Sequence, residues 1–304
     1  MQEVQAKKLD SFILHATLYA LAFFRADVKG LEEQMGWFEA RPDVENFGFA
    51  LAADTEAYRG HLARAREYTA RSVSSAIRAD SRENGAIWLE NAALREAAFG
   101  NFDVAALDAA KGLKLAPDSQ GVALEAALAY ALAGYSSQRR SVEQELIKRY
   151  PLNTQVQVLW LPAIQAQAAL GRNEAPAALE LLQNTLPPIE YGLIPFVSNP
   201  SCLYPTYIRG QAYLAAGQGK EAAAEFQKIL DHSGIVWNCW TGALARLGVA
   251  RANALQAKNS TGADADAARV RALAAYKDFL TLWKDADANI PIYQQAKAEY
   301  ASIQ

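Results

Sequence analysis

Small and large apolar residues recur at helical spacing between residues 204 and 230. We expect a first helix over about 204–216, a tight turn at GQGK, and a second helix over about 221–230. Gly210 is small where the two helices would cross, and Phe226 is a large side chain that would fill the space beside the crossing. The stretch therefore predicts a closely packed helical hairpin.

This arrangement repeats along the chain with a fixed period. Gly100 and Gly134 are 34 residues apart, as are Pro117 and Pro151. Pairs of helices with small residues at the crossings and a period of 34 are typical of the tetratricopeptide repeat. The alternative is an alanine-rich helical bundle whose units do not stack as repeats.

The whole chain, 1–304, is interpreted as one all-α array, a right-handed superhelix (α-solenoid) with a concave groove lined by the first helix of each hairpin. A capping helix is expected at 291–303. Two insertions interrupt the period, a proline-rich segment at 187–205 and an exposed turn at 258–266. The seven expected hairpins start near residues 12, 46, 86, 120, 157, 203 and 241.

Composition narrows the classes of function. Half of the 304 residues are apolar, which is enough for a large core, and the net charge of −3 is too small to suggest nucleic acid as a partner. No apolar run reaches the roughly 18 residues of a membrane span, so we expect no membrane insertion by this chain. Two cysteines and three histidines, none at ligand spacing, predict neither a metal site nor a cofactor.

In a repeat array the expected chemistry is recognition, and the helical register predicts which side chains face the groove. They are mostly aromatics and amides with few charges, which suits an extended peptide or a partner helix. The groove lacks the run of Lys and Arg that would capture an acidic peptide terminus. The alternative is that these residues pack between neighbouring first helices. The predicted groove residues are Glu90, Asn91, Leu94, Glu125, Trp160, Gln167, Tyr204, Tyr207, Gln211 and Arg246.

The two cysteines occupy similar places in neighbouring units. Cys202 lies eight residues before Gly210, and Cys239 lies nine residues before Gly248. Both would therefore sit at the entrance of adjacent first helices, where a disulfide could form. Such a bond would favour an oxidising compartment. Two separate buried thiols are the alternative.

Three phrases carry a resemblance to a known family. They are "DTEAYRGHLARARE" (54–67), "GQAYLAAGQGKEAAAEFQKILDHSGIV" (210–236) and "YKDFLTLWKDADANIP" (276–291). They resemble the C-terminal tetratricopeptide-repeat region of bacterial eukaryotic-like serine/threonine protein kinases of the acidobacterial type. The resemblance implies a regulatory or sensory role, in some cases outside the cytoplasm.

The kinase machinery itself is missing from the sequence. There is no G-x-G-x-x-G loop after a strand, no H-R-D and no D-F-G. We therefore expect a non-enzymatic module that binds protein or peptide, excised from a longer protein that is itself a kinase. The alternative is a small-molecule receptor or an enzyme whose site is built around 187–205. We favour the extracytoplasmic side, while the partner and the oligomeric state are left open.

Overall fold

The structure, a computed structural model, describes residues 11–183 and 202–304. Most of the insertion expected at 187–205 lies outside these residues. The described residues form helices joined by turns, with no strand among them. The helices are α2 (Phe12–Phe24), α3 (Val28–Glu39), α4 (Glu45–Tyr58), α5 (Leu62–Arg78), α6 (Arg82–Phe99), α7 (Phe102–Leu115), α8 (Gln120–Ala133), α9 (Ser136–Arg149), the π-helical η1 (Gln155–Trp160), α10 (Leu161–Gly171), α11 (Ala175–Leu182), α13 (Tyr204–Ala215), α14 (Gly219–Asp231), α15 (Ser233–Val236), α16 (Trp240–Asn259), α17 (Gly262–Leu282) and α18 (Pro291–Ile303).

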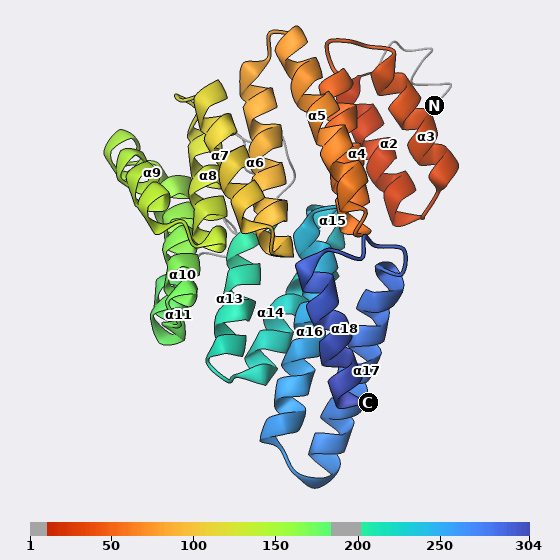
Figure 1. The fold of residues 1–304 in the computed structure, drawn as a ribbon, viewed down its shortest axis with the longest axis vertical. Helices are drawn as coiled ribbons and strands as arrows, with labels where there is room; N and C mark the ends of the chain where they lie inside the picture. Colours follow the sequence, from red (N-terminus) through yellow and green to blue (C-terminus); the bar gives the residue numbers. More distant parts are fainter. Residues whose placement is uncertain (1–10, 184–201) are drawn as a thin grey trace.

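Successive helices pack as hairpins, and each hairpin packs against the next (Figure 1). This arrangement is consistent with an α-solenoid. The first helix of each hairpin begins within four residues of its expected start. The largest differences are an observed start at 82 where 86 was expected, and one at 161 where 157 was expected. Helix α18 spans Pro291–Ile303, where the capping helix was expected. The first helices of the hairpins begin at residues 12, 45, 82, 120, 161, 204 and 240.

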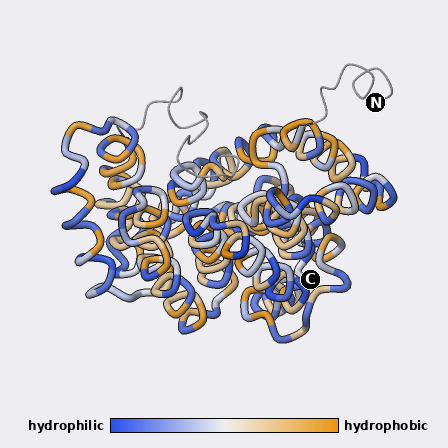
Figure 2. The backbone as a smooth tube through the Cα atoms, turned by 90° about the horizontal axis from the view of Figure 1, so that it is seen from above, coloured by the Kyte–Doolittle hydropathy of each residue, from blue (hydrophilic) through white to orange (hydrophobic). Residues whose placement is uncertain are grey.

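In the hairpin of α8 and α9, the first helix is enclosed and the second lies outside. Helix α8 is apolar around most of its circumference, and Leu124 and Leu128 are fully buried. Helix α9 is polar and buries little beyond Leu146. A helix that is hydrophobic all round belongs in a core, whereas one with a single apolar stripe covers it. Seen from above, hydrophilic and hydrophobic positions alternate along the turns of the helices (Figure 2).

Phe226 joins two neighbouring hairpins. Its ring is fully buried between Gly210 on α13 and Gly248 on α16. A Cβ atom at Gly210 would lie 2.8 Å from the ring, and one at Gly248 would lie 2.5 Å from it. Only glycine therefore lets both helices approach the ring, which is the packing that the sequence predicted at Gly210.

Of two turns predicted from the sequence, the structure has one as expected and the other in a shorter form. Gly217 ends the first helix of its hairpin with φ of 77°, a left-handed conformation that glycine adopts without strain. The exposed turn expected at 258–266 is wrong in its extent, because only Ser260 and Thr261 separate α16 from α17. The alanine-rich sequence after Gly262 favours helix over turn.

The C-terminal segment returns to the second hairpin, α4 and α5, which the prediction of an open groove did not include. Asp287, in the loop after α17, donates its backbone N–H to the carbonyl oxygen of Gly60 at 3.0 Å. The indole nitrogen of Trp283 donates to the carbonyl oxygen of Tyr58 at 2.9 Å. Figure 1 shows this segment against the lower ends of α4 and α5.

Further contacts extend the closure along the N-terminal half. The Asn238 amide donates to the carbonyl oxygen of Leu51 on α4 at 2.9 Å. Pro291, at the start of α18, lies against the turn at Gly100, where a Cβ would be 2.9 Å from the proline ring. Helix α4 therefore packs on both α6 and α16. The inner face of the first helices is enclosed along α4, α6 and α8 rather than exposed as a continuous groove.

Candidate functional site

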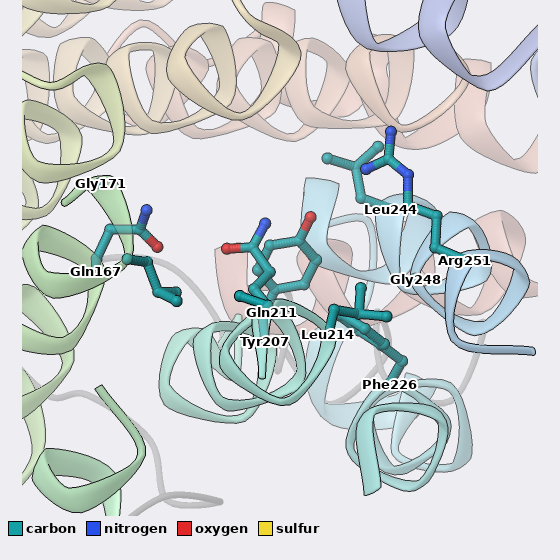
Figure 3. A pocket seen from close by; sticks show the side chains of 11 residues that line it. Gln167, Gly171, Tyr207, Gln211, Leu214, Phe226, Leu244, Gly248 and Arg251 are labelled. Atoms are coloured by element: carbon teal, nitrogen blue, oxygen red, sulfur yellow. The ribbon is translucent and has the colours of Figure 1, made fainter. Parts of the chain in front are cut away.

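A cavity of ≈ 470 Å³ lies among helices α10, α13, α14 and α16. We call it the α10–α13–α16 cavity, and Figure 3 shows it from close by. Its volume is within the range of small-ligand and peptide-side-chain sites. The cavity is lined by Gln167, Leu170, Gly171, Tyr207, Gln211, Leu214, Ala215, Phe226, Leu244, Gly248 and Arg251.

Helical periodicity brings the lining residues together. Tyr207, Gln211 and Leu214 are at positions i, i+4 and i+7 of α13, and therefore share one face. Leu244, Gly248 and Arg251 have the same spacing on α16. Because α10, α13 and α16 are the first helices of three successive hairpins, these faces turn toward the same space.

The polar part of the cavity consists mainly of amides and a phenol. Gln167 is only 8% exposed, and its Oε1 atom is buried without a hydrogen-bond partner among the described residues. Figure 3 shows the amides of Gln167 and Gln211 facing the same space, with the Tyr207 ring beside Gln211. Burial raises the pKa of Tyr207 to about 12, although Arg251 and the Gln211 side chain oppose this. Its hydroxyl is therefore a protonated donor at neutral pH.

Arg251 is the one charged residue among the described lining residues, and it is already paired. Its Nε and Nη2 atoms donate to the two carboxylate oxygens of Glu299 on α18, both at 2.9 Å. The Tyr276 hydroxyl donates to the same carboxylate at 2.8 Å. A two-point fork of this kind neutralises the guanidinium and fixes its plane. The cavity therefore carries little net charge.

Three of the ten predicted groove residues line the cavity, six lie in the interior, and one lies in neither place. Gln167, Tyr207 and Gln211 line the α10–α13–α16 cavity. Arg246 is half-buried on α16 and does not line it. The other six are buried in the interior, which corrects the expectation that they face an open groove: Glu90, Asn91, Leu94, Glu125, Trp160 and Tyr204.

The interior aromatic residues form a packed chain rather than a surface. The ring centroids of Trp160 and Tyr204 are 5.8 Å apart, and Tyr204 stacks on Trp240 at 5.8 Å. Tyr207 meets Trp240 edge-on at 5.1 Å and Phe226 at 5.6 Å. This row of aromatic rings extends from buried Trp160 to Phe226, which lines the cavity. Tyr207 belongs to both, which makes it a structural anchor as well as a lining residue.

Sequence reasoning missed Leu214, Leu244 and Arg251. The i, i+4, i+7 spacing from Tyr207 would have found Leu214, and the same spacing from Leu244 would have found Arg251. The pairing of Arg251 with Glu299 has no comparable signal, because the two residues are 48 positions apart.

Buried carboxyl groups gather in the interior near α6 and α8. Glu90 is fully buried, and neither of its carboxylate oxygens has a hydrogen-bond partner among the described residues. Burial, with the nearby Glu125 and Asp108 carboxylates, raises the pKa of Glu90 well above its ordinary value. Burial and the Asp54 carboxylate raise the pKa of Glu125 in the same direction. Gly112 makes room for Glu90, because a Cβ there would collide with the carboxylate.

A third carboxyl group in the interior, that of Asp54, is paired with an arginine. Arg95 donates from Nη1 to Asp54 Oδ1 at 2.8 Å and from Nη2 to Thr69 Oγ1 at 2.7 Å. Burial still raises the pKa of Asp54 to about 6, with Arg95 acting against it. The interior therefore holds acids that bind protons more tightly in the folded chain than in the unfolded chain.

Glu90→Gln is expected to stabilise the fold at neutral pH by about 1–3 kcal/mol, because it removes the cost of burying an unpaired carboxylate. The pKa of Glu90 is higher in the folded chain than its ordinary value of 4.5 in the unfolded chain. The free energy of unfolding is therefore highest below pH 4.5 and falls as the pH rises toward the folded pKa. The variant should show a shallower fall in unfolding free energy between pH 4.5 and 8. Urea denaturation across that range measures it.

The matched control is Glu83→Gln, which changes an exposed glutamate on the same helix. It should leave the slope of stability against pH close to that of the unmodified chain. Equal slopes for all three chains would show that Glu90 does not ionise at a cost in the folded state.

The structure joins Cys202 and Cys239 by a disulfide, with Cα atoms 5.6 Å apart. Both residues are 5% exposed, at the entrances of α13 and α16. The Thr241 hydroxyl donates to the carbonyl oxygen of Cys202 at 2.7 Å, which binds the same two segments a second time. The bond thus fixes the spacing of two helices that line the cavity.

No protein-family model matches the chain, and a search of curated proteins finds no match either. Within residues 11–183 and 202–304, no group of three or more His, Cys, Asp or Glu side chains is arranged to hold a metal ion. The described helices include none with the length and apolar character of a membrane span. The cavity and its amides therefore provide the basis for a functional assignment.

Proposed function

We propose that this chain is a non-enzymatic module that binds protein or peptide through the α10–α13–α16 cavity. The observation that carries the proposal is the convergence of Gln167, Tyr207 and Gln211 on one cavity of ≈ 470 Å³. Amides with both a donor and an acceptor beside apolar side chains suit a peptide, whose backbone offers both groups at short intervals.

The repeat type and the parent protein belong to the same proposal. The 34-residue spacing and the succession of helical hairpins support a tetratricopeptide-repeat superhelix. The phrases at 54–67, 210–236 and 276–291 support a role as the sensor or scaffold region of a bacterial serine/threonine protein kinase. Such a region would present the cavity to a partner while a separate domain carries out phosphoryl transfer.

Gln211→Ala is expected to weaken peptide binding about tenfold, because it removes one amide from the cavity while leaving the α13 backbone helical. The peptide is selected from a random library displayed on phage and then measured by fluorescence anisotropy. Gln138→Ala, at an exposed position on α9, is the matched control and should bind with unchanged affinity. If panning enriches no peptide, or if Gln211→Ala binds as tightly as the control, the cavity is not the binding site.

A further inference from the structure

Gln167 presents an unmet hydrogen-bonding requirement in the α10–α13–α16 cavity. Its side chain is more than nine-tenths buried, and its Oε1 atom has no partner among the described residues. A buried acceptor without a donor is costly, so a ligand N–H placed here gains more than the same contact would in water. Gln211, on the facing side, can donate and accept in turn.

The charge of the cavity excludes one class of ligand. Arg251 is the only charged lining residue described, and Glu299 holds it in a fork with two contacts of 2.9 Å. An ionised ligand group would lose its hydration without gaining an unpaired counter-charge. The cavity therefore favours an uncharged segment over one that carries a carboxylate or an ammonium group.

The floor of the cavity is apolar. Leu170, Leu214 and Leu244 lie on α10, α13 and α16, and each of them lines the cavity together with Phe226. Gly171 and Gly248 add no side chains, so the space above this floor remains open to a ligand. Such a floor is the kind of surface on which an aliphatic or aromatic side chain of a partner anchors.

We propose that the cavity binds an uncharged, extended peptide segment that carries a side chain of leucine or phenylalanine size. A backbone N–H of the segment donates to Gln167 Oε1, the Gln211 amide pairs with the neighbouring peptide unit, and the apolar side chain lies on the Leu170, Leu214 and Leu244 floor. This inference rests on the proposed function and names the ligand class for the same site.

The test uses blocked pentapeptides of the form acetyl-Ala-Ala-X-Ala-Ala-amide, with X as Leu, Phe, Asp or Lys. Binding to the full chain is followed by chemical-shift changes of the glutamine side-chain amides. The Leu and Phe peptides should bind at least about tenfold more tightly than the Asp and Lys peptides. An ester analogue of the Leu peptide, which lacks the N–H of X, should bind roughly tenfold more weakly than the amide.

Gln167→Met supplies the decisive variant, because it keeps the size of the side chain and removes the acceptor. Replacing a buried acceptor that has no partner among the described residues, such as Gln167 Oε1, by an apolar group is close to neutral for folding, which thermal unfolding verifies. In this variant the amide and ester peptides should bind equally. A residue with a merely structural role would not remove the distinction between the two peptides.

Several outcomes would overturn the inference. Equal binding of the amide and ester peptides by the unmodified chain would remove Gln167 as the acceptor. Preference for Asp or Lys would remove the uncharged ligand class. If no pentapeptide binds, but library panning yields a peptide whose binding is weakened by Gln211→Ala, the inference fails while the proposed function stands. If panning also yields nothing, both fail.

Discussion

Replacing Phe226 with alanine is expected to lower the unfolding free energy by about 3–5 kcal/mol. The ring is fully buried and fills the space that Gly210 and Gly248 leave between α13 and α16. Because both facing positions lack side chains, neither helix can fill the cavity that the substitution creates. Urea denaturation followed by helical circular dichroism measures the loss.

Phe102→Ala is the matched control, since Phe102 is 48% exposed on α7. Its cost should stay within about 0.5 kcal/mol. A second variant tests the geometry directly: Gly248→Ala should destabilise the unmodified chain, because the new Cβ meets the ring, but should cost less when Phe226 is already alanine. Additive effects in the double variant would contradict the close contact between Gly248 and Phe226.

Removing the disulfide by Cys202→Ala together with Cys239→Ala is expected to cost about 2–4 kcal/mol. The two residues are 37 positions apart, so the bond closes a loop that contains α13, α14 and α15. A reducing agent should lower the melting temperature of the unmodified chain and leave that of the double variant unchanged. Thermal unfolding of both proteins, with and without reductant, measures the difference.

Mass spectrometry tests the bond itself. Alkylation of the unfolded protein without reductant should add no groups to the purified chain. Two added alkyl groups would show two free thiols, and with them the main reason to favour an oxidising compartment would be lost.

The all-helical fold could be predicted from the sequence, because each helix depends mainly on side chains within its own hairpin and the next. Gly210 and Phe226 illustrate this, since the small and large residues that meet lie within one hairpin. The 258–266 segment was misjudged because Asn259, Ser260 and Thr261 suggest a long turn, while the alanines that follow continue into helix. The prediction of a long turn gave too little weight to the helix propensity of these alanines.

Residues of the candidate site could be predicted only where their positions follow from the spacing within one helix. Gln167, Tyr207 and Gln211 could be found from helical spacing alone. Glu90 and Glu125 were assigned to an open groove, because nothing within one repeat reveals that α16 and α18 return to α4 and α6. That return depends on contacts such as Trp283 with Tyr58, which are 225 positions apart. Hydrophobic periodicity carries no information at that range.

The contacts between Gly60 and Asp287 and between Tyr58 and Trp283 also restrict how such a chain can change over evolutionary time. An open array lengthens or shortens by duplication or loss of whole units, because each unit touches only its neighbours. Here the loss of one hairpin between α4 and α16 would shift and rotate the returning segment, so that neither the Asp287–Gly60 nor the Trp283–Tyr58 hydrogen bond could form. The number of hairpins is therefore fixed by the closure, much as the number of strands is fixed in a closed barrel.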